Sequence, residues 1–189
     1  ANVDARQIAK TLIQYIETNP EKRVQEFLAA TSFLIDKLKK ASSTLSLLAR
    51  IYCNRADGYL SLKKYQQALA DFDQALDHHT LSVRGYLGRA KVYNKLERDE
   101  DALLNLNRAF EIEPDNQLVL LNRGQVYESM KRYEEALRDF ERIIELELKL
   151  KPIAYSRKGI VLYKMDRYQE AAETLTEAVK AEPSFEFSW

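Results

Sequence analysis

Few residues in this chain have side chains whose types and spacing could support chemistry. His78 and His79 are the two histidines, and Cys53 is the one cysteine. Neighbouring residues on a helix point about 100° apart, so the two histidines cannot ligate one metal as an i,i+4 pair does. They stand where a helix is expected to end, and histidine interacts favourably with the dipole there. Cys53 has no second cysteine and no histidine near it in sequence, which predicts an unreactive thiol, buried or on a binding surface.

Motifs for catalysis are also missing from the sequence. It contains no Gly-rich phosphate loop, no Gly-x-Ser-x-Gly segment and no His-Glu-x-x-His segment. Its many pairs of acidic residues are expected on solvated helix faces. We therefore expect neither an enzyme nor a metal or cofactor site. The chain has 29 basic and 29 acidic side chains, and this balance argues against a nucleic-acid partner, which would require a surplus of positive charge.

The composition predicts a helical protein without a membrane span. Apolar residues make up 46%, and five Gly and four Pro are too few for the turns of an all-β protein. No apolar run reaches the 18 or so residues that a transmembrane helix needs. A lone Cys53 favours a reducing compartment such as the cytoplasm, although a secreted protein without disulfides would look the same. The chain starts at Ala1 rather than Met, from which we expect a processed or cut terminus, so localisation stays open.

An internal repeat gives the elements that must position any binding residues. Ala68, Ala102, Ala136 and Ala171 are spaced by 34, 34 and 35 residues, and three of them stand in similar segments such as Tyr133-Glu-Glu-Ala-Leu. A period of this length is typical of stacked helical hairpins. We expect four helix–turn–helix units, covering residues 49–82, 83–116, 117–151 and 152–185.

Each unit follows the same packing plan. Its first helix carries a small residue where backbones must approach closely, and its second helix carries a bulky residue four positions after the alanine. The small residues are Ala56, Ala90, Gly124 and Gly159, and the bulky ones are Phe72, Leu106, Phe140 and Leu175. Nine of the eleven tyrosines recur at three positions of the unit, which predicts core packing rather than a cofactor site. They are Tyr52, Tyr86, Tyr155, Tyr59, Tyr93, Tyr127, Tyr65, Tyr133 and Tyr168.

This pattern resembles the tetratricopeptide repeat (TPR) family, as in the stretch from Gly124-Gln-Val-Tyr127 through Tyr133-Glu-Glu-Ala-Leu to Phe140. The resemblance covers residues 49–185 and implies an all-α fold, a right-handed α-solenoid of four repeats. The sequence departs from the family pattern at Asp99, at Ile143 and at the positions without proline, Thr80 and Leu148. Because Ile143 replaces a small residue, we expect looser or shifted packing in the third unit.

Both ends lie outside the repeat. Residues 1–48 are expected to form two helices, from Val3 to about Thr18 and, after the N-cap Asn19, to about Lys40. Helical spacing places apolar residues of the second helix on one face, namely Val24, Phe27, Leu28, Ile35 and Leu38. The two helices would cap the first repeat, as solenoids require, with a degenerate repeat or a dimerisation segment as alternatives. Residues 186–189 would start a fifth repeat or a C-terminal helix, since Trp189 falls at the position of Tyr52.

In this family the first helix of each unit lines a concave groove, so the resemblance implies a binding face there. The face of these first helices that does not pack in the core would include Cys53, Leu87, Leu118, Ile153 and Tyr163. Its charged residues are six cations (Arg50, Arg84, Lys91, Lys95, Arg157 and Lys164) and two acids (Asp57 and Glu128). The net charge of about +4 predicts an extended partner segment that is acidic or ends in a free carboxyl group. A chance excess on a solvated face is the alternative. The residues expected to bind the peptide are Arg50, Asn54, Arg84, Lys91, Lys95, Asn122, Gln125, Arg157 and Lys164.

The function we expect is therefore a non-catalytic scaffold or adaptor for protein–protein interaction. An assembly or oligomerisation scaffold and a regulatory domain of a larger enzyme are the alternatives. Some family members clamp the acidic C-terminus of heat-shock chaperones with five residues. Asn122 and Arg157 match that set, whereas Leu87, Lys91 and Ile153 do not, so the chaperone-associated role is disfavoured.

Overall fold

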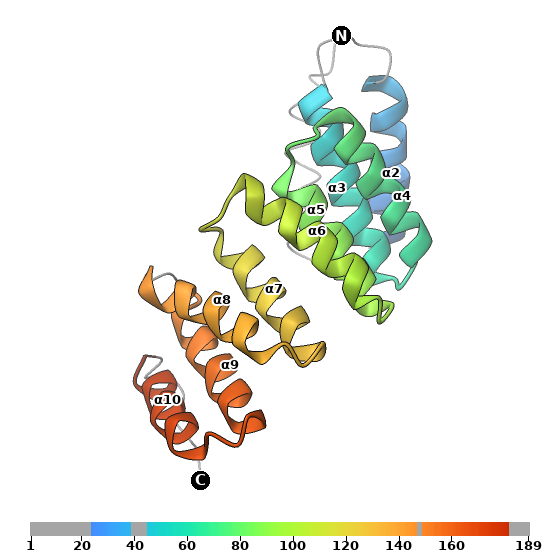
Figure 1. The fold of residues 1–189 in the computed structure, drawn as a ribbon. Helices are drawn as coiled ribbons and strands as arrows, with labels where there is room; N and C mark the ends of the chain where they lie inside the picture. Colours follow the sequence, from blue (N-terminus) through green and yellow to red (C-terminus); the bar gives the residue numbers. More distant parts are fainter. Residues whose placement is uncertain (1–23, 39–44, 147–148, 182–189) are drawn as a thin grey trace. The chain divides into compact units, whose positions relative to one another are not determined.

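The computed structural model describes residues 24–38, 45–146 and 149–181, and this part of the chain is helical without a strand. Figure 1 shows the helices following one another as hairpins. They are α2 (Val24–Leu38), α3 (Leu45–Ser61), α4 (Tyr65–His78), α5 (Val83–Lys95), α6 (Asp99–Ile112), α7 (Gln117–Ser129), α8 (Tyr133–Glu145), α9 (Lys151–Lys164) and α10 (Tyr168–Ala181). The chain divides into two compact units, Ala1–Val92 and Tyr93–Trp189, and each is described by itself.

The turn inside each hairpin has the same backbone geometry. It contains one residue in the left-handed region, with φ between 57° and 60°, at Lys63, Glu97, Lys131 and Asp166. The amide of the next residue then donates to a carbonyl five positions back, as Arg132 does to Tyr127 at 2.8 Å. This bond satisfies a carbonyl that the helix end would otherwise leave open. Four such turns, 34 or 35 residues apart, give the repeat its local structural basis.

Small residues on first helices accommodate bulky residues on second helices, as the sequence predicts. A Cβ placed on Gly124 in α7 would lie 2.6 Å from the ring of Phe140 in α8, and one on Gly159 in α9 would lie 2.6 Å from the side chain of Leu175 in α10. Both distances are shorter than any carbon–carbon contact. The hairpins α7–α8 and α9–α10 therefore depend on glycine for their close approach.

In the second unit, Phe140 packs in a core that also contains Leu120 and Val161. Ile143 is fully buried in the same cluster. The larger side chain at this position is therefore accommodated inside the core.

The first unit has its own core, in which α2 packs against α3. Phe27, Leu28 and Ile35 of α2 are buried, as expected of the apolar face of the second N-terminal helix. Tyr52 of α3 and Phe72 of α4 are among the most buried large side chains. The expected helix over residues 3–18 and the expected start of a fifth repeat at 186–189 lie outside the described residues. The helix α3 begins at Leu45, ahead of the expected repeat boundary at residue 49.

The tyrosines divide into core and surface residues. Tyr52 is buried, and most of the other repeated tyrosines are half-buried. Tyr168 departs from the prediction, since 56% of it is exposed. It begins α10, after which no further described helix covers it, and its ring meets Tyr163 edge-on at 5.3 Å. The hydroxyl of Tyr168 donates to Asp166 at 2.5 Å.

Candidate functional site

In the first unit, the predicted binding residues lie on α3 and on the first part of α5. Arg50 is exposed on α3 and Asn54 is half-buried one turn further along. Arg84 of α5 donates to the carboxylate of Asp57 on α3 at 2.6 Å, with about half of each side chain exposed. The charge of Arg84 is therefore compensated by Asp57, one of the two acids that the sequence places on the same face.

Two residues expected on this face belong to the core instead. Cys53 is 2% exposed and Leu87 is 7% exposed. Burial is the main cause that raises the pKa of the Cys53 thiol to about 11. The thiol is thus protonated and shielded at neutral pH, so Cys53 is a structural residue and not a reactive one.

The helix α5 carries two further cations of the predicted site, Lys91 in the first unit and Lys95 in the second. Both are exposed. Within the described residues neither forms an ion pair, and the same holds for Arg50. These three cations of the predicted site therefore have no acidic partner among the described side chains.

In the second unit, Glu128 of α7 links the predicted residues of α9. It is only 9% exposed, and its carboxylate accepts a bond from Lys164 at 2.5 Å and lies 4.0 Å from Arg157. The structure thus brings Arg157 and Lys164 together around one buried acid. Their combined excess charge is about +1 rather than +2, because Glu128 offsets one of them.

The two polar predicted residues of α7 are half-buried. The amide of Asn122 donates to the carbonyl of Leu118 at 2.7 Å, so its oxygen remains to accept a bond. Gln125 lies one turn before Glu128, on the same helix face. These positions suit hydrogen bonds to the backbone of a bound segment.

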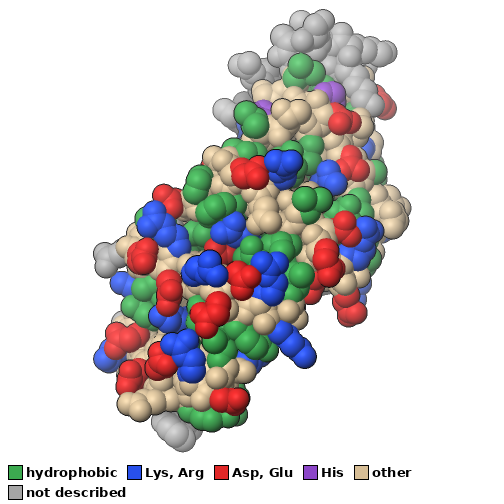
Figure 2. All heavy atoms as spheres, viewed as in Figure 1, with side chains coloured by type: hydrophobic (Ala, Val, Ile, Leu, Met, Phe, Trp, Pro, Cys, Tyr) green, Lys and Arg blue, Asp and Glu red, His purple; other side chains and the backbone are tan. Residues whose placement is uncertain are grey.

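Exposed apolar side chains accompany these polar residues on α7 and α9. Leu118 is 45% exposed, Ile153 and Ile160 are about as exposed, and Tyr163 is 63% exposed. Surface charge is mixed: in Figure 2, Lys and Arg side chains alternate with Asp and Glu over the face in view, with apolar side chains between them. Exposed apolar area thus lies on α7 and α9, whereas the cations without an ion pair lie on α3 and α5.

The sequence reasoning missed a set of buried ion pairs that fix the hairpins. Arg55 of α3 holds Asp71 of α4 with two bonds of 2.6 Å, and Arg123 of α7 holds Asp139 of α8 with bonds of 2.8 and 2.7 Å. In both pairs the arginine stands 16 residues before the aspartate. Burial raises the pKa of Asp139, and the two bonds from Arg123 oppose that rise. The recurring Arg–Asp spacing was the signal that could have revealed them.

Each of these arginines also reaches the preceding helix of its stack. Arg55 donates to Ser32 of α2 at 2.9 Å, and Arg123 donates to Asn107 of α6 at 3.5 Å. The guanidinium of Arg123 lies 3.6 Å above the ring of Phe110. The guanidinium of Arg123, on α7, thus contacts both α6 and α8. Arginine can do this because its planar group holds several N–H donors in fixed directions.

Two further features of the described residues concern metal binding and the membrane. No group of three or more His, Cys, Asp or Glu side chains there is arranged to hold a metal ion. No described helix is both long enough and apolar enough to cross a membrane.

The comparisons with known proteins agree with the architecture. Tetratricopeptide repeat family models match residues 49–79, 118–148 and 153–185. No curated protein sequence matches the chain. Many solved structures resemble it, and three of them, all at low sequence identity, are informative about the fold.

The first is MamA (residues 41 to the end) from Desulfovibrio magneticus, with a TM-score of 0.79 and 16% identity over 98% of this chain and 99% of that one. The second is a tetratricopeptide repeat protein from Parabacteroides merdae, with a TM-score of 0.78 and 20% identity over 96% of this chain and 68% of that one. The third, YrrB, is described as a TPR protein with an unusual peptide-binding site; its TM-score is 0.67 and its identity 20%, over 92% of this chain and 93% of that one.

The structural relatives show the same helical fold. The family matches support a scaffold for protein–protein interaction, a class that is generally non-catalytic. The chain belongs to the tetratricopeptide repeat family.

Proposed function

We propose that this protein is a non-catalytic scaffold that binds an extended segment of a partner protein along its first helices, and that the segment is acidic or ends in a free carboxyl group. The observation that carries the proposal is the compensation pattern of the charges. Both acids of the predicted face, Asp57 and Glu128, already pair with cations of that face. The exposed Arg50, Lys91 and Lys95 have no such partner among the described side chains. A ligand carboxylate would supply the missing counter-charge.

The apolar side chains of the second unit would add contact area to this recognition. Leu118, Ile153 and Tyr163 are exposed on α7 and α9, and Arg157 and Lys164 also belong to α9. An extended segment with a leucine or phenylalanine near its acidic residues would bury part of this surface. Burial of apolar area stabilises such a complex, at roughly 25 cal/mol per Å² before the costs of association. The preferred partner segment is therefore acidic with at least one apolar side chain.

Fluorescence anisotropy with synthetic peptides tests the proposal. The probe is a labelled 12-residue peptide rich in Asp, Glu and Leu with a free carboxyl terminus, compared with versions carrying Asn and Gln or a C-terminal amide. We expect the Asp and Glu peptide to bind most tightly and its affinity to fall as salt is raised, because the contacts are electrostatic. Equal binding of the Asn and Gln peptide would contradict the charge preference.

A charge-reversal pair supplies the matched control. Arg50→Glu with Lys91→Glu should weaken binding at least tenfold. Lys63→Glu with Lys131→Glu changes the net charge by the same amount, but these residues are in the turns between first and second helices. The control should bind like the wild type. Equal loss in both variants would show a general charge effect and no site on the first helices.

A second candidate function, self-assembly, rests on a different surface. Leu175 and Val179 of α10 are 39% and 54% exposed and stand one turn apart on one helix face. Sedimentation equilibrium tests it: a homodimer that Val179→Glu dissociates would favour assembly, and a monomer at all concentrations would leave the peptide-binding scaffold as the function.

A further inference from the structure

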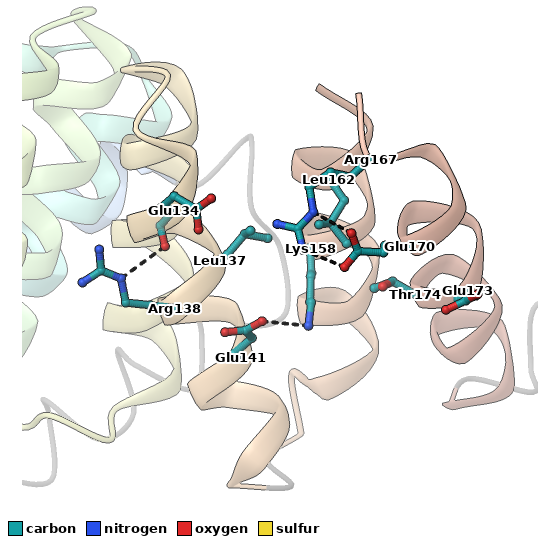
Figure 3. A pocket seen from close by; sticks show the side chains of 10 residues that line it. All are labelled: Glu134, Leu137, Arg138, Glu141, Lys158, Leu162, Arg167, Glu170, Glu173 and Thr174. Atoms are coloured by element: carbon teal, nitrogen blue, oxygen red, sulfur yellow. Dashed lines mark hydrogen bonds and ion pairs between the residues drawn. The ribbon is translucent and has the colours of Figure 1, made fainter. Parts of the chain in front are cut away.

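A cavity of about 290 Å³ opens between α8, α9 and α10 in the second unit, away from the predicted peptide-binding residues. Figure 3 shows side chains from α8 and α10 lining opposite walls, with Lys158 and Leu162 of α9 between them. The remaining lining residues are Glu134, Leu137, Arg138, Glu141, Arg167, Glu170, Glu173 and Thr174.

The position of the cavity in the repeat explains why it exists. Lys158 and Thr174 are 16 residues apart, as are Arg123 and Asp139 in the preceding hairpin. Thr174 is the seventh residue of α10, just as Asp139 is the seventh residue of α8. In the preceding hairpin, the guanidinium of Arg123 occupies the space that corresponds to this cavity and binds Asp139. Here a lysine and a threonine replace the arginine and the aspartate, so the planar group and its carboxylate partner are both missing.

The charges of the lining favour a cationic occupant. Four glutamates face three cations, which leaves a net charge of about −1. Lys158 pairs with Glu141 at 2.8 Å, and Arg167 pairs with Glu170 at 2.6 Å. Within the described part of the chain, Glu134 and Glu173 have no cationic partner within ion-pair distance. Glu173 accepts one bond from the amide of Gln169 at 3.3 Å. Both carboxylates can still accept bonds from a cationic ligand, whereas Lys158 and Arg167 already pair with Glu141 and Glu170.

We propose that this cavity accepts an arginine side chain of a partner protein. Its guanidinium takes the place that Arg123 occupies one hairpin earlier, donating to carboxylates and to the hydroxyl of Thr174. Leu137 and Leu162 contact its aliphatic part. Arginine suits the site better than lysine because its fork of donors can reach both second helices at once, as that of Arg123 does with Asp139 and Asn107. This contact is independent of the acidic segment proposed for the first helices.

Chemical-shift mapping of the whole chain with N-acetyl-arginine amide tests the proposal. We expect saturable shifts at Glu141, Lys158 and Thr174, with a dissociation constant on the order of millimolar, as befits one side chain. N-acetyl-lysine amide should bind at least several-fold more weakly. N-acetyl-glutamate amide is the opposite-charge probe, and preferential binding of it here would overturn the proposal in favour of an anion site.

Two variants locate the contact. Lys158→Arg with Thr174→Asp rebuilds the Arg–Asp pair inside the cavity, so it should abolish arginine binding while the melting temperature is kept or raised. Glu134→Gln removes one of the two carboxylates that have no cationic partner, without filling the space, and should weaken binding several-fold. Unchanged binding in either variant would overturn the proposal. The acidic-peptide assay serves as the independent control, since these variants should leave it unaffected.

Discussion

Replacing Gly124 with alanine tests how strictly the hairpin α7–α8 depends on close approach. The added Cβ would lie 2.6, 2.8 and 3.1 Å from three ring atoms of Phe140, where ordinary contacts are 3.4 Å or longer. The ring would have to move by roughly an ångström. Phe140 is fully buried in the core cluster, and close-packed interiors resist such a shift.

Two effects of opposite sign determine how much Gly124→Ala changes the free energy of unfolding. Overpacking a core typically costs about 1–3 kcal/mol. Alanine in place of glycine within a helix contributes about 0.5–1 kcal/mol in the other direction. We expect Gly124→Ala to lower the free energy of unfolding by about 1 kcal/mol, the balance of these two effects.

A matched control exists in the first unit. A Cβ at Gly58 in α3 would lie 3.4–3.5 Å from Phe27 and Leu28, which is ordinary contact. Gly58→Ala should therefore stabilise by about 0.5–1 kcal/mol from helix propensity alone. Urea unfolding followed by circular dichroism measures both variants, and adding Phe140→Leu to Gly124→Ala should recover part of the loss. If Gly124→Ala is as stabilising as Gly58→Ala, the close-approach reasoning is refuted.

Three further predictions follow from the core and the turns. Asp139→Asn should destabilise by about 3 kcal/mol in urea unfolding, because it leaves the buried guanidinium of its partner without a counter-charge; Glu135→Gln, at an exposed pair, is the control and should change the midpoint little. The raised pKa of Cys53 means that its contribution to stability is complete below the unfolded-state pKa near 9 and is lost toward pH 11. The stability advantage of wild type over Cys53→Ala should therefore shrink by about 2–3 kcal/mol between pH 8 and 11, and a constant difference would contradict the burial of the thiol. Lys131→Gly should stabilise by about 0.5–1 kcal/mol, since glycine adopts the left-handed turn without steric cost; destabilisation would mean that the lysine side chain makes contacts that outweigh this gain.

Features that depend on local spacing could be predicted from the sequence. The pairing of Gly124 with Phe140 follows from the recurring small and bulky positions, because helical periodicity decides which residues share a face. The same periodicity identified α2 as amphipathic. It did not identify the exposure of Tyr168, which depends on contacts between helices and not on spacing within one helix.

Side-chain pairing was harder to predict because it joins residues on different helices. The bond from Lys164 to Glu128 spans 36 residues, and the one from Arg84 to Asp57 spans 27. Counting charges on one predicted face therefore concealed which cations were already compensated. Cys53 was placed on the binding face by periodicity, although the helix packs closely enough to bury it.

The central claim, that an acidic segment binds along the first helices, is tested most directly by amide chemical-shift mapping with the acidic 12-residue peptide. We predict that the largest shifts fall on α3, α5, α7 and α9, at residues such as Asn54, Lys91 and Gln125. Shifts confined to the second helices α4, α6, α8 and α10, or none at saturating peptide, would contradict the claim.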